Sequence, residues 1–392
     1  MTLSNRINDI AEDMKAVRRE LHQNPGTAYE EFFASDMVAA KLTEWGIPFE
    51  RNWAKTGIVA TIEGRPGGRA IGIRADMDAL NIVEESGVAH ASKIPGKMHA
   101  CGHDGHTSIL LGTAKYLAET KNFTGKVHLF FQPAEEGGGG AIEMVKDGLF
   151  DKFPADHVYA LHNWPYMPKG SFGTRAGPIM GAVDRVRITV TGKGGHAAIP
   201  HPTIDPIPVA SEIVMALQMI VSRNVNPLDS AVVSVTNFNA GTGAENIIPS
   251  EAKLTISVRS FTHEVRDLLE KRITEIVNGI AALHGAKADI EYARGYDPTI
   301  NSESETALAI NVAREVFGAE NVNENVEPTL GAEDFGAMLK ERPGCYVWLG
   351  QGTGNASSPH DQGLHHPKYD FNDDILPLGI EYFAKLTEAS LK

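Results

Sequence analysis

Cysteines and long apolar runs are both scarce in this sequence of 392 residues, which contains only two cysteines. Two cysteines cannot build the disulfide framework of a secreted protein, and this indicates a reducing compartment. No stretch of about 18 apolar residues occurs, and the amino-terminal 19 residues lack the apolar core of a signal peptide. We therefore expect a cytoplasmic protein without a membrane span.

Positive charge is also in short supply. Lys and Arg total 36 against 50 Asp and Glu, so the formal net charge is -14 at pH 7. This net charge argues against nucleic acid or an anionic membrane as the main partner, although it does not exclude local basic pockets. The apolar fraction of 42% is ordinary for a globular protein, and a chain of 392 residues usually forms more than one core. We expect two domains.

Predicted strands alternate with predicted helices through the first half of the chain. The strands are expected at 58–62, 70–73, 127–131 and 157–161, with a Gly-Arg-Pro-Gly-Gly turn between the first two, and the helices at 31–45, 107–119 and 141–147. This order is typical of an α/β domain, in which a mostly parallel sheet carries helices on both faces. A helix at 305–317, a strand at 346–349 and a helix at 374–390 continue the same pattern.

The pattern changes between residues 184 and 296. Strands whose apolar residues alternate with polar ones are expected at 186–190, 231–238 and 252–258, beside helices at 209–223 and 263–284. Half-buried strands of this kind favour an antiparallel sheet with one covered face. We therefore predict a smaller inserted α+β domain at 184–296, which divides the α/β domain into residues 1–183 and 297–392.

The stretch from Met98 to His106 reads M-H-A-C-G-H-D-G-H. It sets three imidazoles, one thiol and one carboxylate within nine residues, a density of metal-binding groups for which a hydrophobic core has no use. A redox role is excluded by spacing, because the chain has no C-x-x-C pair and its other cysteine is Cys345. The stretch therefore predicts a metal site, with a solvated polar loop as the alternative.

Further polar groups follow the predicted strands. Because the carboxyl ends of parallel strands meet at one edge of a sheet, we expect these groups to converge on the 98–106 loop. The candidate metal donors are Cys101, His103, Glu136, His162 and one of His365 or His366. Thiolate, imidazole and carboxylate suit Zn²⁺, with Mn²⁺, Co²⁺ or Ni²⁺ feasible, and five ligands are more than one open catalytic zinc needs. Two divalent ions that share a ligand and activate water would equip the protein for hydrolysis.

Glu135 and Glu136 are adjacent carboxylates on a turn after a strand. Their side chains point in different directions, so one can bind metal while its neighbour accepts a proton from water. A surface acidic pair is the alternative. The glycines at 137–140 allow a substrate to approach closely, and they form no Walker loop because no Lys-Ser or Lys-Thr follows them.

The inserted domain carries weaker signals. The stretch Gly192-Lys-Gly-Gly-His196 places an imidazole on a turn, where it could donate to a developing oxyanion, although a plain hairpin turn is as compatible with the pattern. Asn246 and Arg259 could bind a carbonyl and a carboxylate, and each could equally be structural.

Apolar residues from Ile7 to Leu21 recur at helical spacing and predict an opening helix that ends near Asn24. His22, at the end of this helix, is expected to be structural.

The sequence resembles, nearly end to end, the two-domain metallo-amidohydrolases that include aminoacylases, metallo-carboxypeptidases and hippurate hydrolase. It is most similar to the branch of hippurate hydrolase, N-acyl-L-amino-acid amidohydrolase and auxin-conjugate hydrolase. The motifs that carry the resemblance are R-A-D-M-D-A-L, M-H-A-C-G-H-D-G-H, F-Q-P-A-E-E-G, L-H-N, G-x-G-G-H-A-A-x-P-H, G-A-E-D-F and L-H-H-P. The resemblance implies a catalytic α/β domain interrupted by a lid domain that also forms a homodimer, with a dinuclear metal centre.

The family pattern also implies roles for single residues. Cys101, His103, Glu136, His162 and His365 would be metal ligands, His365 being chosen over His366 by its place in L-H-H-P. Glu135 would be the general base and acid, and His196 would polarise the scissile carbonyl across the dimer. Asn246 and Arg259 would help to bind substrate. Where the wider family has H-x-D, this chain has Asp76-Met77-Asp78, so Asp78 is expected to orient a neighbour.

The resulting functional prediction is metal-dependent hydrolysis of the amide bond of N-acetyl or N-benzoyl amino acids, which releases a carboxylic acid and a free amino acid. Within the same enzyme class, the alternatives are a dipeptidase or carboxypeptidase and an N-acetyl-diaminopimelate deacetylase. An inactive metal-dependent binding or sensor protein is the alternative from another class, although a pure binding site has no need of a base such as Glu135.

Overall fold

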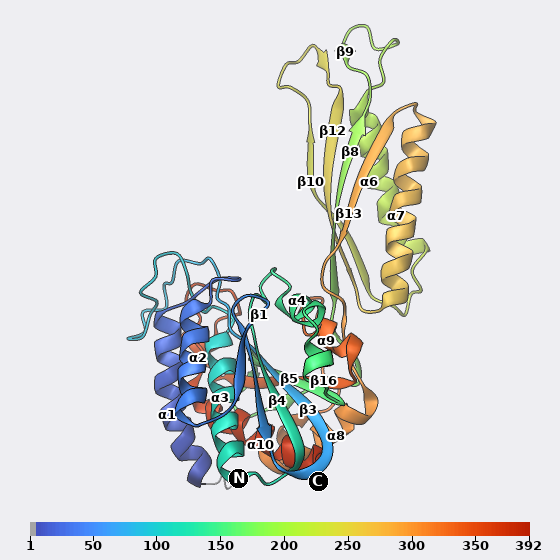
Figure 1. Ribbon diagram of the computed structural model, residues 1–392. Helices are drawn as coiled ribbons and strands as arrows, with labels where there is room; N and C mark the ends of the chain where they lie inside the picture. Colours follow the sequence, from blue (N-terminus) through green and yellow to red (C-terminus); the bar gives the residue numbers. More distant parts are fainter. Residues whose placement is uncertain (1–4) are drawn as a thin grey trace. The chain divides into compact units, whose positions relative to one another are not determined.

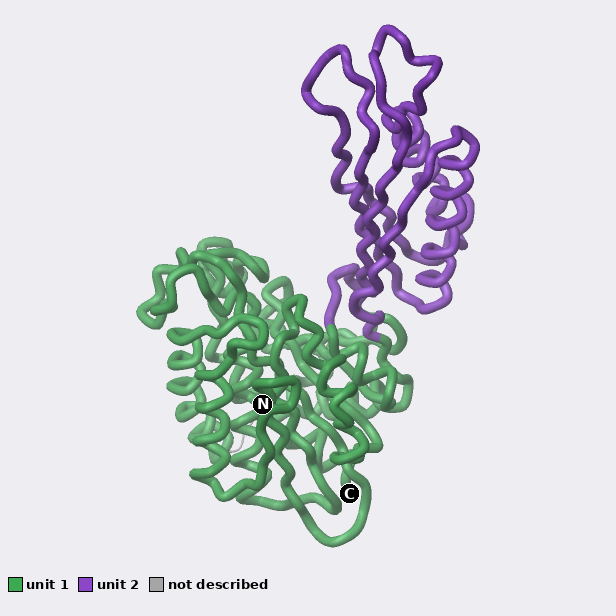
Figure 2. Tube along the Cα trace, turned by 45° about the horizontal axis from the view of Figure 1, so that its top comes forward, with its two compact units in different colours: residues 1–179, 300–327, 334–392 green, residues 180–299, 328–333 purple. Residues whose placement is uncertain are grey.

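The computed structural model describes residues 5–392, which divide into two compact units (Figure 1; Figure 2). Unit 2 consists of Met180–Thr299 and Pro328–Glu333, and the other described residues form unit 1. The predicted insertion covered 184–296, so unit 2 begins earlier and also takes a short segment from the later part of the chain. The strands β7 (Gly177–Met180) and β14 (Thr299–Asn301) lie where the chain passes from one unit to the other.

Unit 1 is built on an eight-stranded sheet of order β1-β2-β4-β3-β5-β16-β6-β15. The four central strands are parallel, namely β4 (Thr124–Gln132), β3 (Arg65–Asp76), β5 (His157–Pro168) and β16 (Gly344–Gly352). Antiparallel pairing adds β1 (Phe49–Trp53) and β2 (Gly57–Glu63) on one side and β6 (Phe172–Gly173) on the other, where β15 (Val322–Asn323) pairs parallel to β6. The predicted mostly parallel α/β sheet is confirmed.

Helices of unit 1 form two groups around the sheet. The larger group packs into the main core and consists of α1 (Asn5–Gln23), α2 (Phe32–Glu44), α3 (His103–Thr120), α8 (Glu303–Phe317) and α10 (Leu376–Ser390). The smaller group consists of α4 (Gly140–Lys146), α5 (Leu149–Lys152) and α9 (Gly336–Glu341). Short 3₁₀ turns occur at Ala319–Asn321, Pro359–Asp361 and Asp373–Ile375. Among residues 5–392, no helix is long and apolar enough to cross a membrane.

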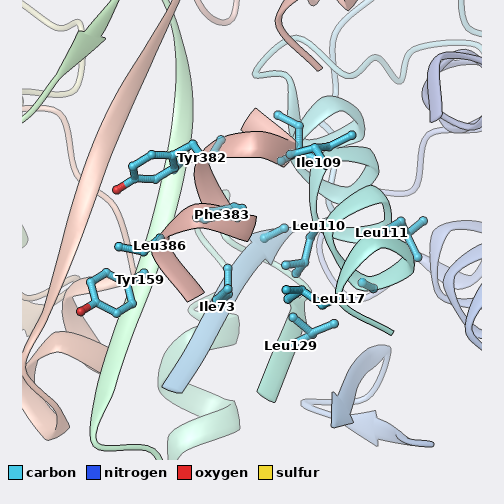
Figure 3. Close-up of a cluster of buried hydrophobic side chains, with 14 of the residues drawn as sticks. Ile73, Ile109, Leu110, Leu111, Leu117, Leu129, Tyr159, Tyr382, Phe383 and Leu386 are labelled. Atoms are coloured by element: carbon cyan, nitrogen blue, oxygen red, sulfur yellow. The ribbon is translucent and has the colours of Figure 1, made fainter. Parts of the chain in front are cut away.

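Successive side chains along the central strands point to opposite faces of the sheet. Ile73 of β3 and Leu129 of β4 point into the core beside Leu110 of α3 (Figure 3). The neighbouring Phe130 is also fully buried but contacts Phe150 of α5, with their ring centroids 6.0 Å apart. Because both faces of these strands are covered, apolar side chains point to both sides of the sheet, as in buried parallel strands.

The turn predicted at Gly64–Gly68 lies where the chain reverses direction, because β2 runs antiparallel to β4 and β3 runs parallel to it. All of these residues except Gly64 already belong to β3, whose pairing with β4 shifts in register between Arg65 and Arg69. Gly67 and Gly68 have φ values of 91° and 85° there, a conformation that glycine adopts without strain.

Unit 2 contains a separate antiparallel sheet of order β10-β12-β8-β13. Its strands are β8 (Ala182–Thr191), β10 (Ala231–Ala240), β12 (Glu251–Ser260) and β13 (Lys287–Arg294), and it has two helices, α6 (Pro206–Arg223) and α7 (His263–Leu283). Val186, Ile188 and Val190 alternate along β8 and join a core shared with both helices. The predicted α+β character of the insertion is confirmed, although the sequence did not reveal β13.

Candidate metal centre

The predicted metal donors of unit 1 gather at the carboxyl ends of the central strands. β3 ends at Asp76, β4 ends at Gln132 just before Glu135, and His162 lies on β5. Helix α3 begins at His103, two residues after Cys101. Parallel pairing aligns these strand ends, which explains why residues far apart in the sequence meet at this edge.

A left-handed residue forms the turn between Cys101 and His103. Gly102 has a φ of 91°, and a Cβ atom at this position would lie 2.2 Å from Oδ1 of Asn163 and 2.6 Å from the hydroxyl of Tyr369. Both the backbone conformation and the tight packing therefore require glycine. The turn thus separates the two candidate donors, with Cys101 just before it and His103 at the first position of α3.

Three overlapping groups of donor atoms form one continuous cluster. The groups, each with ligand atoms within 4.8 Å of one another, are Cys101 with His103 and His162, Cys101 with Glu136 and His365, and His103 with Glu135 and Glu136. Sγ of Cys101 lies 3.4 Å from Nε2 of His162. The five predicted ligands and the predicted base thus lie together. Groups that share Cys101, His103 and Glu136 can hold two neighbouring ions.

Asp78 connects two parts of this cluster. Its Oδ1 lies 3.2 Å from Nδ1 of His103 and accepts a hydrogen bond from the backbone N–H of Glu135 at 3.0 Å. Its Oδ2 accepts from the backbone N–H of Glu136 at 2.9 Å. Asp78 therefore orients His103 and fixes the turn that carries both glutamates, in agreement with its predicted orienting role.

His365, and not its neighbour His366, reaches the cluster. Nε2 of His365 lies 2.9 Å from Oε1 of Glu136, and the backbone N–H of His365 donates to the carbonyl oxygen of Ala100 at 2.8 Å. His365 has a φ of 66°, an uncommon backbone conformation for a residue with a side chain. Nδ1 of His366 instead accepts from the backbone N–H of Lys368.

Burial and charge shape the protonation of the donors. Burial, together with the carboxylates of Glu136 and Glu135, raises the pKa of the Cys101 thiol well above its usual value. Burial and the neighbouring His106 lower the pKa of His162, which favours the neutral imidazole that binds metal. Burial also acts to lower the pKa of His103, but the carboxylates of Asp76 and Asp78 outweigh it and raise that pKa to about 10.

The donor set fits divalent cations. Within residues 5–392, the buried Nε2 of His103 has no hydrogen-bond partner. An orphaned imidazole nitrogen beside a thiol and buried carboxylates is costly unless a cation completes it. Sulfur, nitrogen and oxygen donors in one cluster match the preferences of zinc and related transition metals.

A buried series of hydrogen bonds next to the donors was not predicted from the sequence. Nδ1 of His106 lies 2.6 Å from Oδ1 of Asp76, and Nε2 of His106 lies 2.7 Å from Oδ1 of Asn163. The amide of Asn163 donates to the hydroxyl of Tyr369 at 2.6 Å. The His106 ring packs against His162, with their centroids 4.5 Å apart. This series of hydrogen bonds therefore helps to hold His162 in position. His106 and Asn163 stand beside predicted ligands in the sequence, but their partners are distant along the chain.

His22 is structural, as predicted. Its Nδ1 lies 2.8 Å from Oδ2 of Asp104, and its Nε2 lies 3.2 Å from Oε1 of Glu84. Burial alone would lower the pKa of His22, but the two carboxylates outweigh it and raise that pKa to about 9. His22 therefore ties the first turn of α3 to the 81–97 loop.

The three predicted site residues of unit 2 lie in two places. His196 is exposed on β9 (Gly195–His196), which pairs with β11 (Ile247–Ile248), and the carbonyl oxygen of Asn246 accepts from the next residue, Ala197, at 2.9 Å. Arg259 lies near the other end of β12, where Nη1 donates to the carbonyl oxygen of Leu330 at 3.3 Å. The catalytic and binding roles of all three residues stay predictions.

Residues 72–389 match the model of a known family, described as peptidase family M20/M25/M40. The chain belongs to this family. It is 41% identical over 392 residues to the hippurate hydrolase of Campylobacter jejuni, with 100% of both chains covered. It is 39% identical to an N-acetyl-L-cysteine deacetylase of Bacillus subtilis, covering 96% of this chain and 88% of that one.

A solved structure supports the same membership. The crystal structure of a Bacillus subtilis protein described as a dinuclear metal binding peptidase from the M20 family has a TM-score of 0.85 and 32% identity, and covers 98% of this chain and 99% of that one. The chain is therefore an amidohydrolase of the M20 family, in which dinuclear metal binding occurs. The resemblance inferred from the sequence motifs is confirmed.

Replacement of Gly102 tests the tight turn at the centre of the site. Gly102→Ala should destabilise the protein and lower the amount of bound metal, because the new Cβ displaces Asn163 or the donors. Gly46→Ala is the control, since Gly46 has a φ of 66° but nothing within 4 Å of a new Cβ. The control should lose only about 1–2 kcal/mol, the cost of the left-handed conformation. Denaturant unfolding and metal analysis measure both; equal metal contents in the two variants would contradict this account.

The raised pKa of His22 predicts a pH-dependent contribution to stability. A pKa of about 9 in the folded protein against the ordinary value of 6.5 gives a contribution that is complete below pH 6.5 and is lost as the pH rises through 9. The difference in unfolding free energy between the wild type and His22→Gln should therefore shrink by about 3 kcal/mol across this range. His366→Gln, an exposed replacement, should show no such trend; a His22→Gln difference that is constant with pH would refute the assignment.

Proposed function

We propose that this protein hydrolyses the amide bond of N-acyl amino acids in a metal-dependent reaction, releasing a carboxylic acid and a free amino acid. The observation that carries this proposal is the cluster of thiol, imidazole and carboxylate donors beside Glu135. The full-length similarity to a hippurate hydrolase and to an N-acetyl-L-cysteine deacetylase supports the substrate class.

Cys101, His103, Glu136, His162 and His365 are the proposed ligands of two divalent ions. When bound, such ions supply an acidified water and a polarised substrate carbonyl. The mixed donor set favours Zn²⁺, with Mn²⁺, Co²⁺ and Ni²⁺ as candidates. A free thiol ligand persists in a reducing compartment, so we also propose a cytoplasmic location, which cell fractionation tests.

Glu135 is the proposed general base and acid. Its carboxylate is 6% exposed and lies in the donor group of His103 and Glu136, and its backbone is fixed by Asp78. From this position Glu135 takes a proton from the attacking water and returns it to the leaving nitrogen of the amino acid. A buried carboxylate held beside cations can do this without moving far.

The residues of unit 2 complete the proposal. His196 would donate to the oxygen of the scissile carbonyl from a second copy of the chain, and Asn246 and Arg259 would bind the substrate. A homodimer is supported by the surface of unit 2, where β10 is an edge strand of the sheet. The outer face of α6 exposes Met215 and Met219 at 70% and 58%. Open strand edges and exposed apolar side chains are typical of surfaces that pair.

Sedimentation analysis tests the dimer. The wild type should sediment as a dimer or a dimer-based oligomer, and Met219→Asp should shift it toward the monomer, because a charge would enter an apolar interface. Glu264→Gln, on α7, is a control that should leave the assembly unchanged. A monomeric wild type would refute the dimer.

Hydrolysis of a substrate panel by metal-restored protein tests the proposed reaction. The panel contains N-benzoylglycine, N-acetylated amino acids, N-acetyl-diaminopimelate and dipeptides, which separates the proposed activity from peptidase and deacetylase activities. Glu135→Gln should keep its metal and lose about 10²- to 10⁴-fold in rate, because only proton transfer is removed. Cys101→Ala should lose metal.

Glu143→Gln is the matched control for Glu135→Gln, because Glu143 is an exposed acid on α4 that pairs with Lys146. Its rate should equal that of the wild type. A Glu135→Gln variant with a near-normal rate would refute the base assignment. Stoichiometric metal binding without hydrolysis of any panel member would instead favour the sensor alternative.

A further inference from the structure

A row of aromatic rings lies beside the candidate metal centre in unit 1. Trp164 follows His162 by two residues on β5, and their ring centroids are 6.2 Å apart at an interplanar angle of 80°. Trp348 of β16 stacks on Trp164, with centroids 4.2 Å apart and planes inclined by only 3°. Tyr166 meets the edge of Trp164 at 5.4 Å. The row therefore runs outward from a proposed metal ligand.

The strand register holds this row in place. In the parallel pairing of β5 with β16, Trp348 lies opposite His162 and Gly350 lies opposite Trp164. Gly350 itself approaches the segment after Trp164 closely, since a Cβ atom there would lie 2.2 Å from the carbonyl oxygen of Pro168 and 2.3 Å from Oγ of Ser171. Trp348 is 3% exposed, so the ring behind Trp164 is immobilised by the core of the unit. A ring held in this way loses little conformational entropy when it binds a ligand.

The other side of the row is accessible. Trp164 is partly exposed and Tyr166 is 65% exposed, an unusual fraction for a large aromatic side chain. A Cβ on Gly363 would lie 2.8 Å from the Tyr166 hydroxyl, so Tyr166 packs against the segment that carries His365 two residues later. The aromatic surface thus borders the donors at both His162 and His365.

We infer that Trp164, supported by Trp348 and flanked by Tyr166, selects substrates with a planar aromatic acyl group. This inference rests on the proposed function, because it places the scissile carbonyl at the neighbouring donors. An aromatic ring attached directly to that carbonyl lies within reach of the indole and can stack on it or meet its edge. An acetyl group has no ring to make this contact. Trp164 is therefore a specificity-determining residue rather than a catalytic one.

The test compares two substrates that release the same amino acid, N-benzoylglycine and N-acetylglycine. Trp164→Leu should lower the ratio of their kcat/KM values by about three- to tenfold, the range that one aromatic contact provides. Any loss with N-acetylglycine should be smaller than the loss with N-benzoylglycine, because only the latter loses an aromatic contact, and Trp164→Phe should retain most of the preference. Trp45→Leu is the matched control, since Trp45 is a partly exposed tryptophan of the same unit beside Lys115. Its ratio should not change.

Binding of the released acid gives a second measurement that does not depend on turnover. Benzoate should bind the wild type more tightly than acetate does in calorimetry, and Trp164→Leu should abolish this difference. If Trp164→Leu fails to fold, Tyr166→Leu serves as the test in its place. This exposed replacement should weaken benzoate binding. The inference would be overturned if the ratio of kcat/KM values did not change, as when both substrates lose equally. Equal binding of benzoate and acetate by the wild type would also overturn it. Hydrolysis of no member of the substrate panel, with selective benzoate binding retained, would refute the proposed function and leave the aromatic site standing.

Discussion

The arrangement of the site depends on the hydrogen bonds that the carboxylate of Asp78 makes. Asp78 is 1% exposed and accepts hydrogen bonds from the backbone of both glutamates while it holds the ring of His103. One side chain at the end of β3 thus joins the turn after β4 to the first residue of α3. Charge-assisted bonds of this kind are strong and directional, so the donors share a common frame.

A second buried charge balances the acids around this frame. Arg74 is fully buried on β3, two residues before Asp76, and its guanidinium lies 2.7 Å from Asp76 and 2.9 Å from Asp334. It also donates to Gln132 at the end of β4 at 2.7 Å. Unpaired carboxylates in such a place would be unstable, and an arginine fork satisfies several of them at once. The ends of adjacent strands are thereby held together beneath the donors.

The sequence was most informative where chemistry is concentrated in short motifs. The 98–106 stretch predicted the donors Cys101 and His103, and the order of strands predicted that Glu136 and His162 would join them. The choice of His365 over His366 came from the family pattern alone, because only the folded chain shows which imidazole reaches Glu136.

Contacts between distant residues could not be predicted in the same way. The pairing of His106 with Asp76 and Asn163, and the stacking of Trp164 on Trp348, depend on strand register, which no short motif encodes. Edge strands were also missed, since β13 is only partly buried and its apolar alternation is weak.

The order of strands in unit 1 has a consequence for biosynthesis. β16 lies between β5 and β6 in the sheet, although unit 2 separates β16 from both along the chain. A ribosome therefore completes β5 and all of unit 2 before it supplies the neighbour of β5, and it supplies His365 later still. During that interval the edge of β5 and the donors Cys101 and His162 are already made but not yet enclosed. The full set of proposed metal ligands therefore exists only after His365 has been synthesised, when β16 is available to join the sheet.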